Sequence, residues 1–87
     1  MWIRGPVFGK TTTIRYVLPA ASHVLLRIYG VDGRLVRGLV EAVQGPGDFD
    51  VRWDGRTEVG QPAASGVYFY RLEAGRLSAT HPLVIVR

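Results

Sequence analysis

The 87 residues are enough for one domain and leave no room for a second. With 47% apolar and 21% charged residues, the chain has the composition of an ordered globular domain, which excludes intrinsic disorder. The absence of cysteine excludes disulfides and a thiol nucleophile.

The net charge of +4 comes from arginines that are spread along the chain, with a single lysine at Lys10. Arg15, Arg27, Arg52 and Arg71 each stand alone between apolar neighbours, a pattern that is typical of solvated strand faces. We therefore expect no nucleic-acid partner, which would need a concentrated basic patch. No apolar run approaches 18 residues, so we expect no transmembrane segment.

Residues 1–10 contain Gly5, Pro6 and Gly9, and we interpret them as a lead-in or linker with a possible short edge strand at Trp2–Arg4. The domain proper is expected to cover 11–87. Because the first residues lack the long apolar core of a signal peptide, a secreted protein with this domain would be a longer precursor of which this chain is a piece.

The first two predicted strands are Thr11–Leu18 and His23–Tyr29. The first is rich in β-branched residues and ends at Pro19, which cannot donate to a strand ladder. Alternation with a period of two predicts one inward face on each strand. The inward residues would be Ile14, Tyr16 and Leu18, then Val24, Leu26 and Ile28.

Asp32-Gly33 predicts a tight turn after the second strand. The segment Arg34–Val43 that follows does not alternate cleanly, and its apolar residues also fit a helical stripe. Gly38 in its middle disfavours a helix by about 1 kcal/mol. We favour a strand in which Gly38 marks a β-bulge.

A turn at Gln44–Asp48 leads into the cleanest alternating stretch, Phe49–Trp53. Phe49, Val51 and Trp53 should face the core, with Trp53 as its largest side chain. Asp54-Gly55 ends this strand because glycine accepts a positive φ. A long loop from 54 to 65 follows, broken by Gly60 and Pro62.

Two last strands, Gly66–Ala74 and Leu77–Val86, should pair as a hairpin across Gly75-Arg76. Tyr68, Tyr70 and Leu72 form the apolar set of the first. Gly66 is expected to have a positive φ or to lie close to other backbone. His81-Pro82 should interrupt the second strand, which would then lie at an edge or contain a kink.

This succession of six or seven short strands without a convincing helix predicts an all-β, antiparallel two-sheet sandwich. The residues offer little for catalysis. His23 and His81 lie far apart with no partner at metal-ligand spacing, and neither Ser22 nor Ser65 lies in a nucleophile-elbow motif. We expect a protein that is not an enzyme and needs no cofactor.

Two binding alternatives remain open from the residues. Asp32, Asp48 and Asp54 lie beside glycines, where aspartate caps turns, although the Asp54–Glu58 loop could also be a calcium site. Aromatic residues out of phase with the inward sets could form a sugar-binding platform. These are Trp2, Phe8, Tyr29 and Phe69.

The stretch Val-Arg-Trp-Asp-Gly-Arg at 51–56, followed by Gly60 and by Ala-Ser-Gly-Val-Tyr-Phe-Tyr-Arg-Leu at 64–72, resembles the Ig-like domain of the flagellar hook-capping family. It looks even more like the related C-terminal sorting domain (type A) of proteins exported by the type IX secretion system. Further matching segments occur in the family's order at 11–16, 26–29, 32–34 and 83–87.

The resemblance implies an Ig-like fold of about seven strands and a non-catalytic sorting or attachment domain. Its partners would be the type IX secretion machinery and cargo domains that precede it in the parent chain. The protein would pass the periplasm and be secreted or held at the cell surface. The alternative is a structural Ig-like module, either of the hook-cap scaffold type or a carbohydrate-binding spacer of an extracellular enzyme.

A sorting role would place recognition on the closing strand, Leu83, Val84, Ile85, Val86 and Arg87, and on the sheet edge that it forms. Four consecutive apolar residues exceed what one core face requires, so Val84 and Val86 are expected to point outward. Trp53, Asp54, Gly55, Gly66, Tyr68 and Tyr70 are the expected core and turn residues that support this surface.

Overall fold

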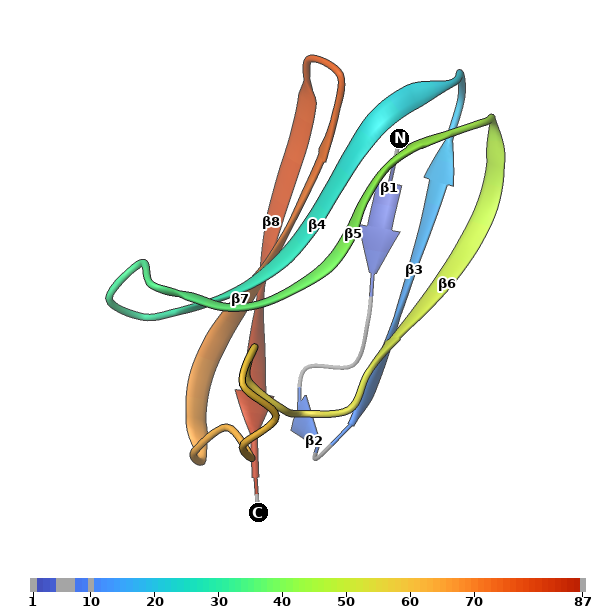
Figure 1. The fold of residues 1–87 in the computed structure, drawn as a ribbon. Coiled ribbons are helices and arrows are strands. Elements are labelled where there is room, and N and C mark those ends of the chain that lie inside the picture. Colours follow the sequence, from blue (N-terminus) through green and yellow to red (C-terminus); the bar gives the residue numbers. More distant parts are fainter. Residues whose placement is uncertain (1, 5–7, 10, 87) are drawn as a thin grey trace.

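The computed structural model describes residues 2–4, 8–9 and 11–86, which form eight strands in two packed sheets (Figure 1). Expectations for the remaining residues, Arg87 among them, lie outside the described part, as do those for the side chains of Trp2 and Phe8. The strands are β1 (Trp2–Arg4), β2 (Phe8–Gly9), β3 (Thr12–Leu18), β4 (Ser22–Gly30), β5 (Leu35–Gln44), β6 (Gly47–Trp53), β7 (Gly66–Ala74) and β8 (Leu77–Ile85).

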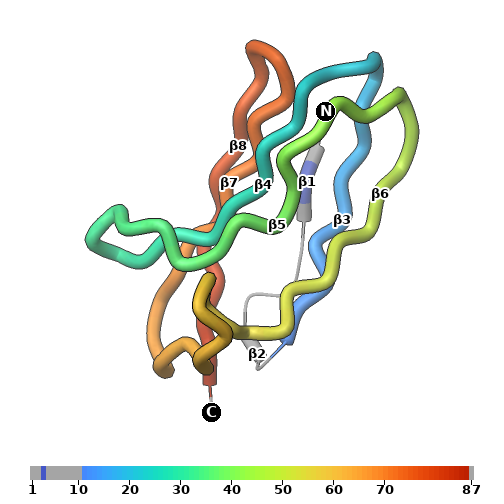
Figure 2. Tube along the Cα trace, viewed as in Figure 1, coloured from blue at the N-terminus to red at the C-terminus, as the bar shows by residue number. Residues whose placement is uncertain are grey.

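One sheet has three strands in the order β1-β3-β6, and the other has five in the order β2-β8-β7-β4-β5. The chain crosses between the sheets after β3 and after β5, at the end of the sandwich that is uppermost in Figures 1 and 2. The all-β Ig-like sandwich is confirmed. Among the described residues, no helix is long and apolar enough to cross a membrane.

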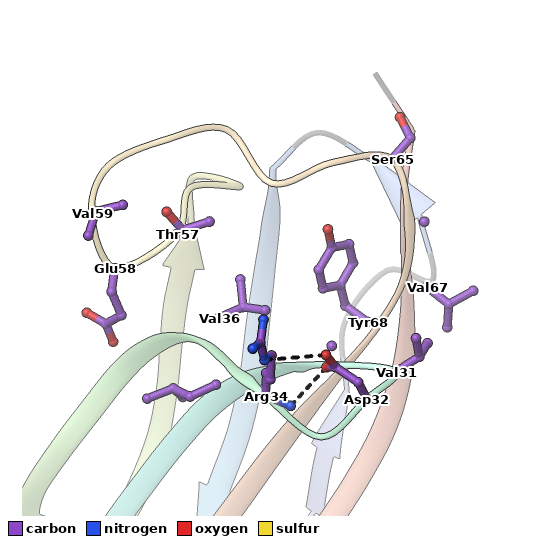
Figure 3. Close-up of a pocket in the computed structure, with 13 residues that line it drawn as sticks. Val31, Asp32, Arg34, Val36, Thr57, Glu58, Val59, Ser65, Val67 and Tyr68 are labelled. Atoms are coloured by element: carbon purple, nitrogen blue, oxygen red, sulfur yellow. Dashed lines mark hydrogen bonds and ion pairs between the residues drawn. The ribbon is translucent and has the colours of Figure 1, made fainter.

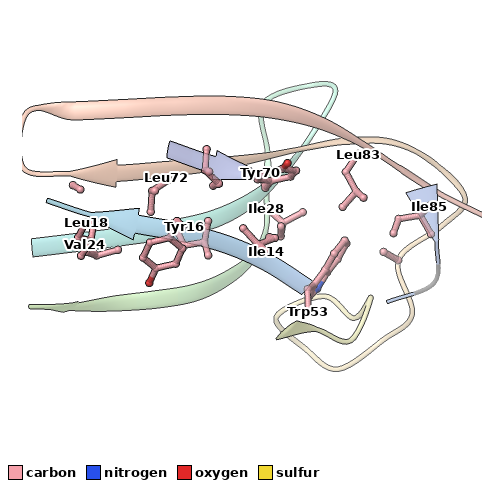
Figure 4. Packing of buried hydrophobic residues seen from close by; sticks show 14 residues of the cluster. Ile14, Tyr16, Leu18, Val24, Ile28, Trp53, Tyr70, Leu72, Leu83 and Ile85 are labelled. Atoms are coloured by element: carbon pink, nitrogen blue, oxygen red, sulfur yellow. The ribbon is translucent and has the colours of Figure 1, made fainter. Parts of the chain in front are cut away.

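The core lies between the two sheets and is built from alternating residues of facing strands (Figure 4). The predicted inward sets of β3 and β4 are confirmed, since all of their members are buried. From β7 and β8 the core receives Tyr70, Leu72, Ala74, Leu83 and Ile85. Removal of this apolar surface from water is the main force that holds the two sheets together.

Irregular pairing of β5 explains why its apolar and polar residues do not alternate. Its pairing with β4 shifts register twice, so that Val36 and Leu39 are each an extra residue on β5. Each bulge moves the side-chain phase by one position, and as a result Val36, Leu39 and Val40 all pack against the core cluster. The bulge expected near Gly38 is confirmed, whereas Val43 is exposed and does not belong to the apolar stripe.

Trp53 is fully buried and connects three parts of the molecule. Its Nε1 donates a hydrogen bond of 2.9 Å to the carbonyl oxygen of Arg56, in the loop that follows β6. Its ring makes a T-shaped contact with the ring of Tyr68 on β7, in the other sheet, with centroids 6.1 Å apart. The prediction that Trp53 is the largest core residue is confirmed.

Some expectations about strand ends were wrong. His81 and Pro82 do not interrupt β8, which pairs with β7 in unbroken register from Leu77 to Ile85. The expected edge position is confirmed at Pro82, because β2, the other described neighbour of β8, pairs only with Val84 and Ile85. His81 is not at a strand end but stacks on Tyr70 across the two strands, with ring centroids 5.6 Å apart.

Asp48 was expected in a turn but lies within β6, where it pairs with Val17. The strand begins two residues earlier than its alternating pattern, at Gly47, because β3 is long enough to pair with those residues as well. The strand pairing thus extends beyond the hydrophobic pattern that predicted it.

Replacing Trp53 by alanine should lower the free energy of unfolding by about 3–5 kcal/mol, because the substitution empties the space between the sheets. Trp53→Phe, which keeps an aromatic ring but loses the Nε1 donor, should cost less. Urea denaturation of both variants measures the effect. A loss below about 1 kcal/mol for the alanine variant would contradict the central place of Trp53.

Gly66 has φ of +153°, which side-chain-bearing residues rarely adopt, although a Cβ there would meet nothing within 4 Å. Glycine is therefore required here for its backbone conformation, and Gly66→Ala should lower the free energy of unfolding by about 1–3 kcal/mol. Gly45→Ala is the matched control, because Gly45 has open space around it and no positive φ. Equal stability of the two variants in thermal unfolding would show that Gly66 is an ordinary strand start.

Candidate recognition surface

The closing strand divides its apolar residues between two faces. Leu83 and Ile85 are 1% exposed and complete the core, whereas Val84 and Val86 are 37% and 54% exposed. Val86 follows directly after the end of β8. The expected outward phase of Val84 and Val86 is confirmed, and the fold leaves these two side chains in contact with water.

The backbone around Val84 is not the open sheet edge that we expected. Phe8 and Gly9 of β2 pair in parallel with Val84 and Ile85, so β8 has a neighbour on both sides at this point. The prediction of an exposed edge at 84–85 was wrong because a two-residue strand in the glycine-containing lead-in gives no periodic signal. A partner at Val84 would meet side chains rather than free backbone groups.

An apolar groove of about 650 Å³ lies next to the closing strand, at the end of the sandwich (Figure 3). Val67 connects the two features, because it lines the groove and is the cross-strand partner of Val84. The groove is lined by the turn after β4, the start of β5, the loop after β6 and the start of β7. Its apolar lining residues are Val31, Leu35, Val36, Val59, Val67 and Tyr68.

Hydrogen bonds hold the turn that forms one wall of the groove. The Gly30 nitrogen donates to the Arg34 carbonyl oxygen at 2.9 Å, and the Gly33 nitrogen donates to the Gly30 carbonyl oxygen at 3.0 Å. The carboxylate of Asp32 accepts from the Arg34 nitrogen at 3.0 Å. The predicted turn at Asp32-Gly33 and the capping role of Asp32 are both confirmed.

The opposite wall is the loop of residues 54–65, and it is tied to the edge of β5. The Glu58 nitrogen donates to the Val36 carbonyl oxygen at 2.9 Å, and the Glu58 side chain accepts a hydrogen bond from the Gly38 nitrogen. The Arg37 guanidinium donates to the carboxylate of Asp54 at 3.3 Å and to the carbonyl oxygen of Arg56 at 3.2 Å. The loop therefore has a defined shape.

The start of this loop depends on Asp54 and Gly55. The carboxylate of Asp54 caps the Arg56 nitrogen at 3.0 Å, as the sequence predicted. Gly55 has φ of +78° and accepts a hydrogen bond from the nitrogen of the buried Ala63 at 2.8 Å. These contacts occupy the Asp54 carboxylate within the protein, and the described residues hold no group of three acidic, histidine or cysteine side chains that could bind a metal ion.

Tyr68 forms the floor of the groove. Its ring contacts Trp53 from the side, and its hydroxyl donates a hydrogen bond of 2.6 Å to the Ala64 carbonyl oxygen. The floor is thus held by the core residue below it and by the loop beside it. Tyr70, two residues further along β7, is buried in the core and does not reach this surface.

Exposed apolar side chains concentrate on this end of the molecule. Six of the eight large hydrophobic residues that are exposed in the described part belong here, and we call them the end-face patch: Val31, Leu35, Val59, Val67, Val84 and Val86. Val59, at 80%, is the most exposed of them. A cluster of this kind is typical of a surface that another protein covers.

Sequence reasoning found Val84 and Val86 but missed the groove. Its walls come from segments that are distant in the chain, and no local pattern brings them together. The one sequence feature that could have indicated the groove is the presence of the apolar residues Val31 and Val59 inside turns that are otherwise polar or glycine-rich.

An exposed ion pair lies on the three-stranded sheet, away from this surface. Arg15 and Asp50 lie 2.8 Å apart on the three-stranded sheet, and this hydrogen bond and charge raise the pKa of the Arg15 guanidinium. Because both side chains are more than half exposed, the pair adds little to stability. The predicted solvated positions of Arg15, Arg52 and Arg71 are confirmed, and Arg27 is half-buried.

Residues 6–78 match the model of a family described as the FlgD Ig-like domain. Among solved structures, FlgD from P. aeruginosa is 24% identical, with a TM-score of 0.65 over 85% of this chain and 57% of that one. PorZ of Porphyromonas gingivalis is 22% identical, with a TM-score of 0.64 over 98% of this chain and 11% of that one. None of the curated proteins matches the chain.

Both structural likenesses show the fold, and in both cases the chain spans only part of the larger protein. PorZ is described as an essential bacterial surface component of the type IX secretion system. The family match covers more than half of the chain.

Proposed function

The chain belongs to the FlgD Ig-like domain family, and we propose that it serves as a sorting and attachment domain at the carboxyl end of an exported cargo protein. The type IX secretion machinery would recognise it as a folded module. Support comes from the resemblance of residues 51–72 and 83–87 to type A sorting domains, and from the structural likeness to PorZ, a component of that system.

The observation that carries this proposal is the outward pair Val84 and Val86. Leu83 and Ile85 already supply the apolar surface that the core takes from this strand. Two further valines that are 37% and 54% exposed oppose solubility, so a partner that covers them is a physical reason to keep them. The groove beside Val67 enlarges the surface available to that partner.

Recognition on this account is through side chains. Because β2 pairs with the backbone of Val84 and Ile85, a partner cannot extend the sheet at this point without displacing β2. The machinery would instead cover the end-face patch with an apolar surface of its own. The domain would be non-catalytic and cofactor-free, and would follow its cargo domains through the periplasm to the cell surface or the medium.

A second candidate is a structural Ig-like module of the hook-cap scaffold type. The family match favours it, as does the likeness to FlgD, of which this chain covers 57%. In such a scaffold the end-face patch would pack against an adjacent domain of the same protein. This alternative requires the same exposed valines but no export machinery.

We expect export of a cargo fused to residues 1–87 in a type IX-competent strain to fall strongly when Val84 and Val86 are both replaced by threonine. Threonine keeps the β-branched shape and β propensity but presents a hydroxyl to the partner. Val43→Thr is the matched control, because Val43 is 75% exposed on β5 and lies outside the end-face patch. Circular dichroism of the purified domains establishes that each variant is folded.

Normal export of the folded double variant would contradict recognition of these side chains. Absence of export for the unsubstituted fusion, with a known type IX cargo exported in the same strain, would contradict the sorting function itself and favour the scaffold alternative.

A further inference from the structure

A second hollow lies on the outer face of the five-stranded sheet, away from the core. Its volume is about 470 Å³, within the usual range for small-molecule sites. It is separated from the groove by the turn after β4, whose residues Gly30 and Val31 line both. Its lining is Tyr29, Gly30, Val31, Gly33, Phe69, Arg71, Glu73 and Thr80.

An apolar strip crosses three strands at this point. Tyr29 on β4 is the cross-strand partner of Phe69 on β7, and Phe69 is the partner of Pro82 on β8. Tyr29 and Phe69 are half-buried, and Pro82 is exposed. Residues in direct register on one face of a sheet lie side by side, so the strip presents two aromatic rings and a proline ring in a row.

A polar row runs parallel to this strip, one pleat further along the strands. Arg27 is the cross-strand partner of Arg71, and Arg71 is the partner of Thr80. Two arginines in direct register repel each other unless acidic groups lie near. Glu73 lies 3.8 Å from Arg71, and the negative charges of Glu41 and Glu73 act on Arg27.

The charges of this row therefore balance. The neighbouring Tyr29 side chain, followed by the two glutamates, raises the pKa of the Arg27 guanidinium, which stays charged at any physiological pH. The row offers guanidinium and hydroxyl donors together with carboxylate acceptors, without an excess of either sign. Such a surface does not attract a strongly anionic ligand.

We propose that this hollow binds a neutral sugar, as one pyranose unit of a polysaccharide. A pyranose has a face of C–H groups with partial positive charge, which fits against the negative faces of aromatic rings. Its hydroxyls both donate and accept hydrogen bonds, which matches the mixed donors and acceptors of Arg71, Glu73 and Thr80. A purely apolar segment would remove this polar row from water without offering it any new hydrogen bond.

The turn after β4 gives the hollow its rim and fixes the shape of the site. Gly33 has φ of +82°, and the hydrogen bonds within Gly30–Arg34 hold the turn against movement. A site that is formed before binding loses less conformational entropy when the ligand arrives. Sugar binding here would not depend on Val84, Val86 or the proposed export function.

The test is an NMR titration of the 87-residue chain with the methyl glycosides of glucose, galactose, mannose and N-acetylglucosamine, at up to tens of millimolar. At least one glycoside should give saturable shifts confined to Tyr29, Phe69, Arg71, Thr80 and their neighbours. Phe69→Leu, which keeps apolar packing but removes the ring, should weaken that binding by about tenfold. Arg71→Gln, at an exposed position, should weaken it without affecting the fold.

Val43→Thr serves as the control and should bind as the unsubstituted chain does. The proposal is overturned if none of the glycosides gives saturable shifts, or if the shifts map elsewhere on the domain. It is equally overturned if two single variants both bind with unchanged affinity: Arg71→Gln, and a folded Phe69→Leu or Tyr29→Leu. Shifts that rise linearly without saturation count as non-specific and against the proposal.

Discussion

The buried ring of Trp53 is the contact on which the proposed recognition surface depends. It fills the space between the sheets, meets Tyr68 of the opposite sheet and binds the Arg56 carbonyl oxygen through Nε1. The last contact sets the path of the loop after β6, which Arg37 and Glu58 then fasten to the edge of β5. The groove is therefore a consequence of how the core closes at this end.

The way in which the core closes at this end also leaves apolar side chains on the surface of the domain. The five-stranded sheet has an inner face that the three-stranded sheet covers and an outer face that no described strand covers. On β8 the inward-facing residues Leu83 and Ile85 pack in the core, whereas Val84 faces outward beside its cross-strand partner Val67. Further along the outer face the apolar strip of Tyr29, Phe69 and Pro82 adjoins charged residues. The domain thus has two outward surfaces whose chemistry differs, one apolar and one mixed.

Much of the fold was predictable because most strands pack on one face only. Alternation identified the inward residues of β3, β4 and β6, and the break at Gly66 was visible from its place between a loop and a strand. The inward residues of β5 could not be identified from alternation because two bulges change which of its side chains face the core. The parallel pairing of Phe8 and Gly9 was not predictable, since two residues carry no period, and the groove was missed because its walls meet only in three dimensions.

The central claim is that the closing strand uses one face for the fold and leaves the other for a partner. Its most direct test compares the unfolding free energies of two double variants, Leu83→Thr with Ile85→Thr and Val84→Thr with Val86→Thr. The account predicts that the inward pair loses roughly 2–5 kcal/mol or more, by analogy with core truncations, and that the outward pair loses less than about 1 kcal/mol. Similar losses for the two variants would contradict it, because Val84 and Val86 would then belong to the core.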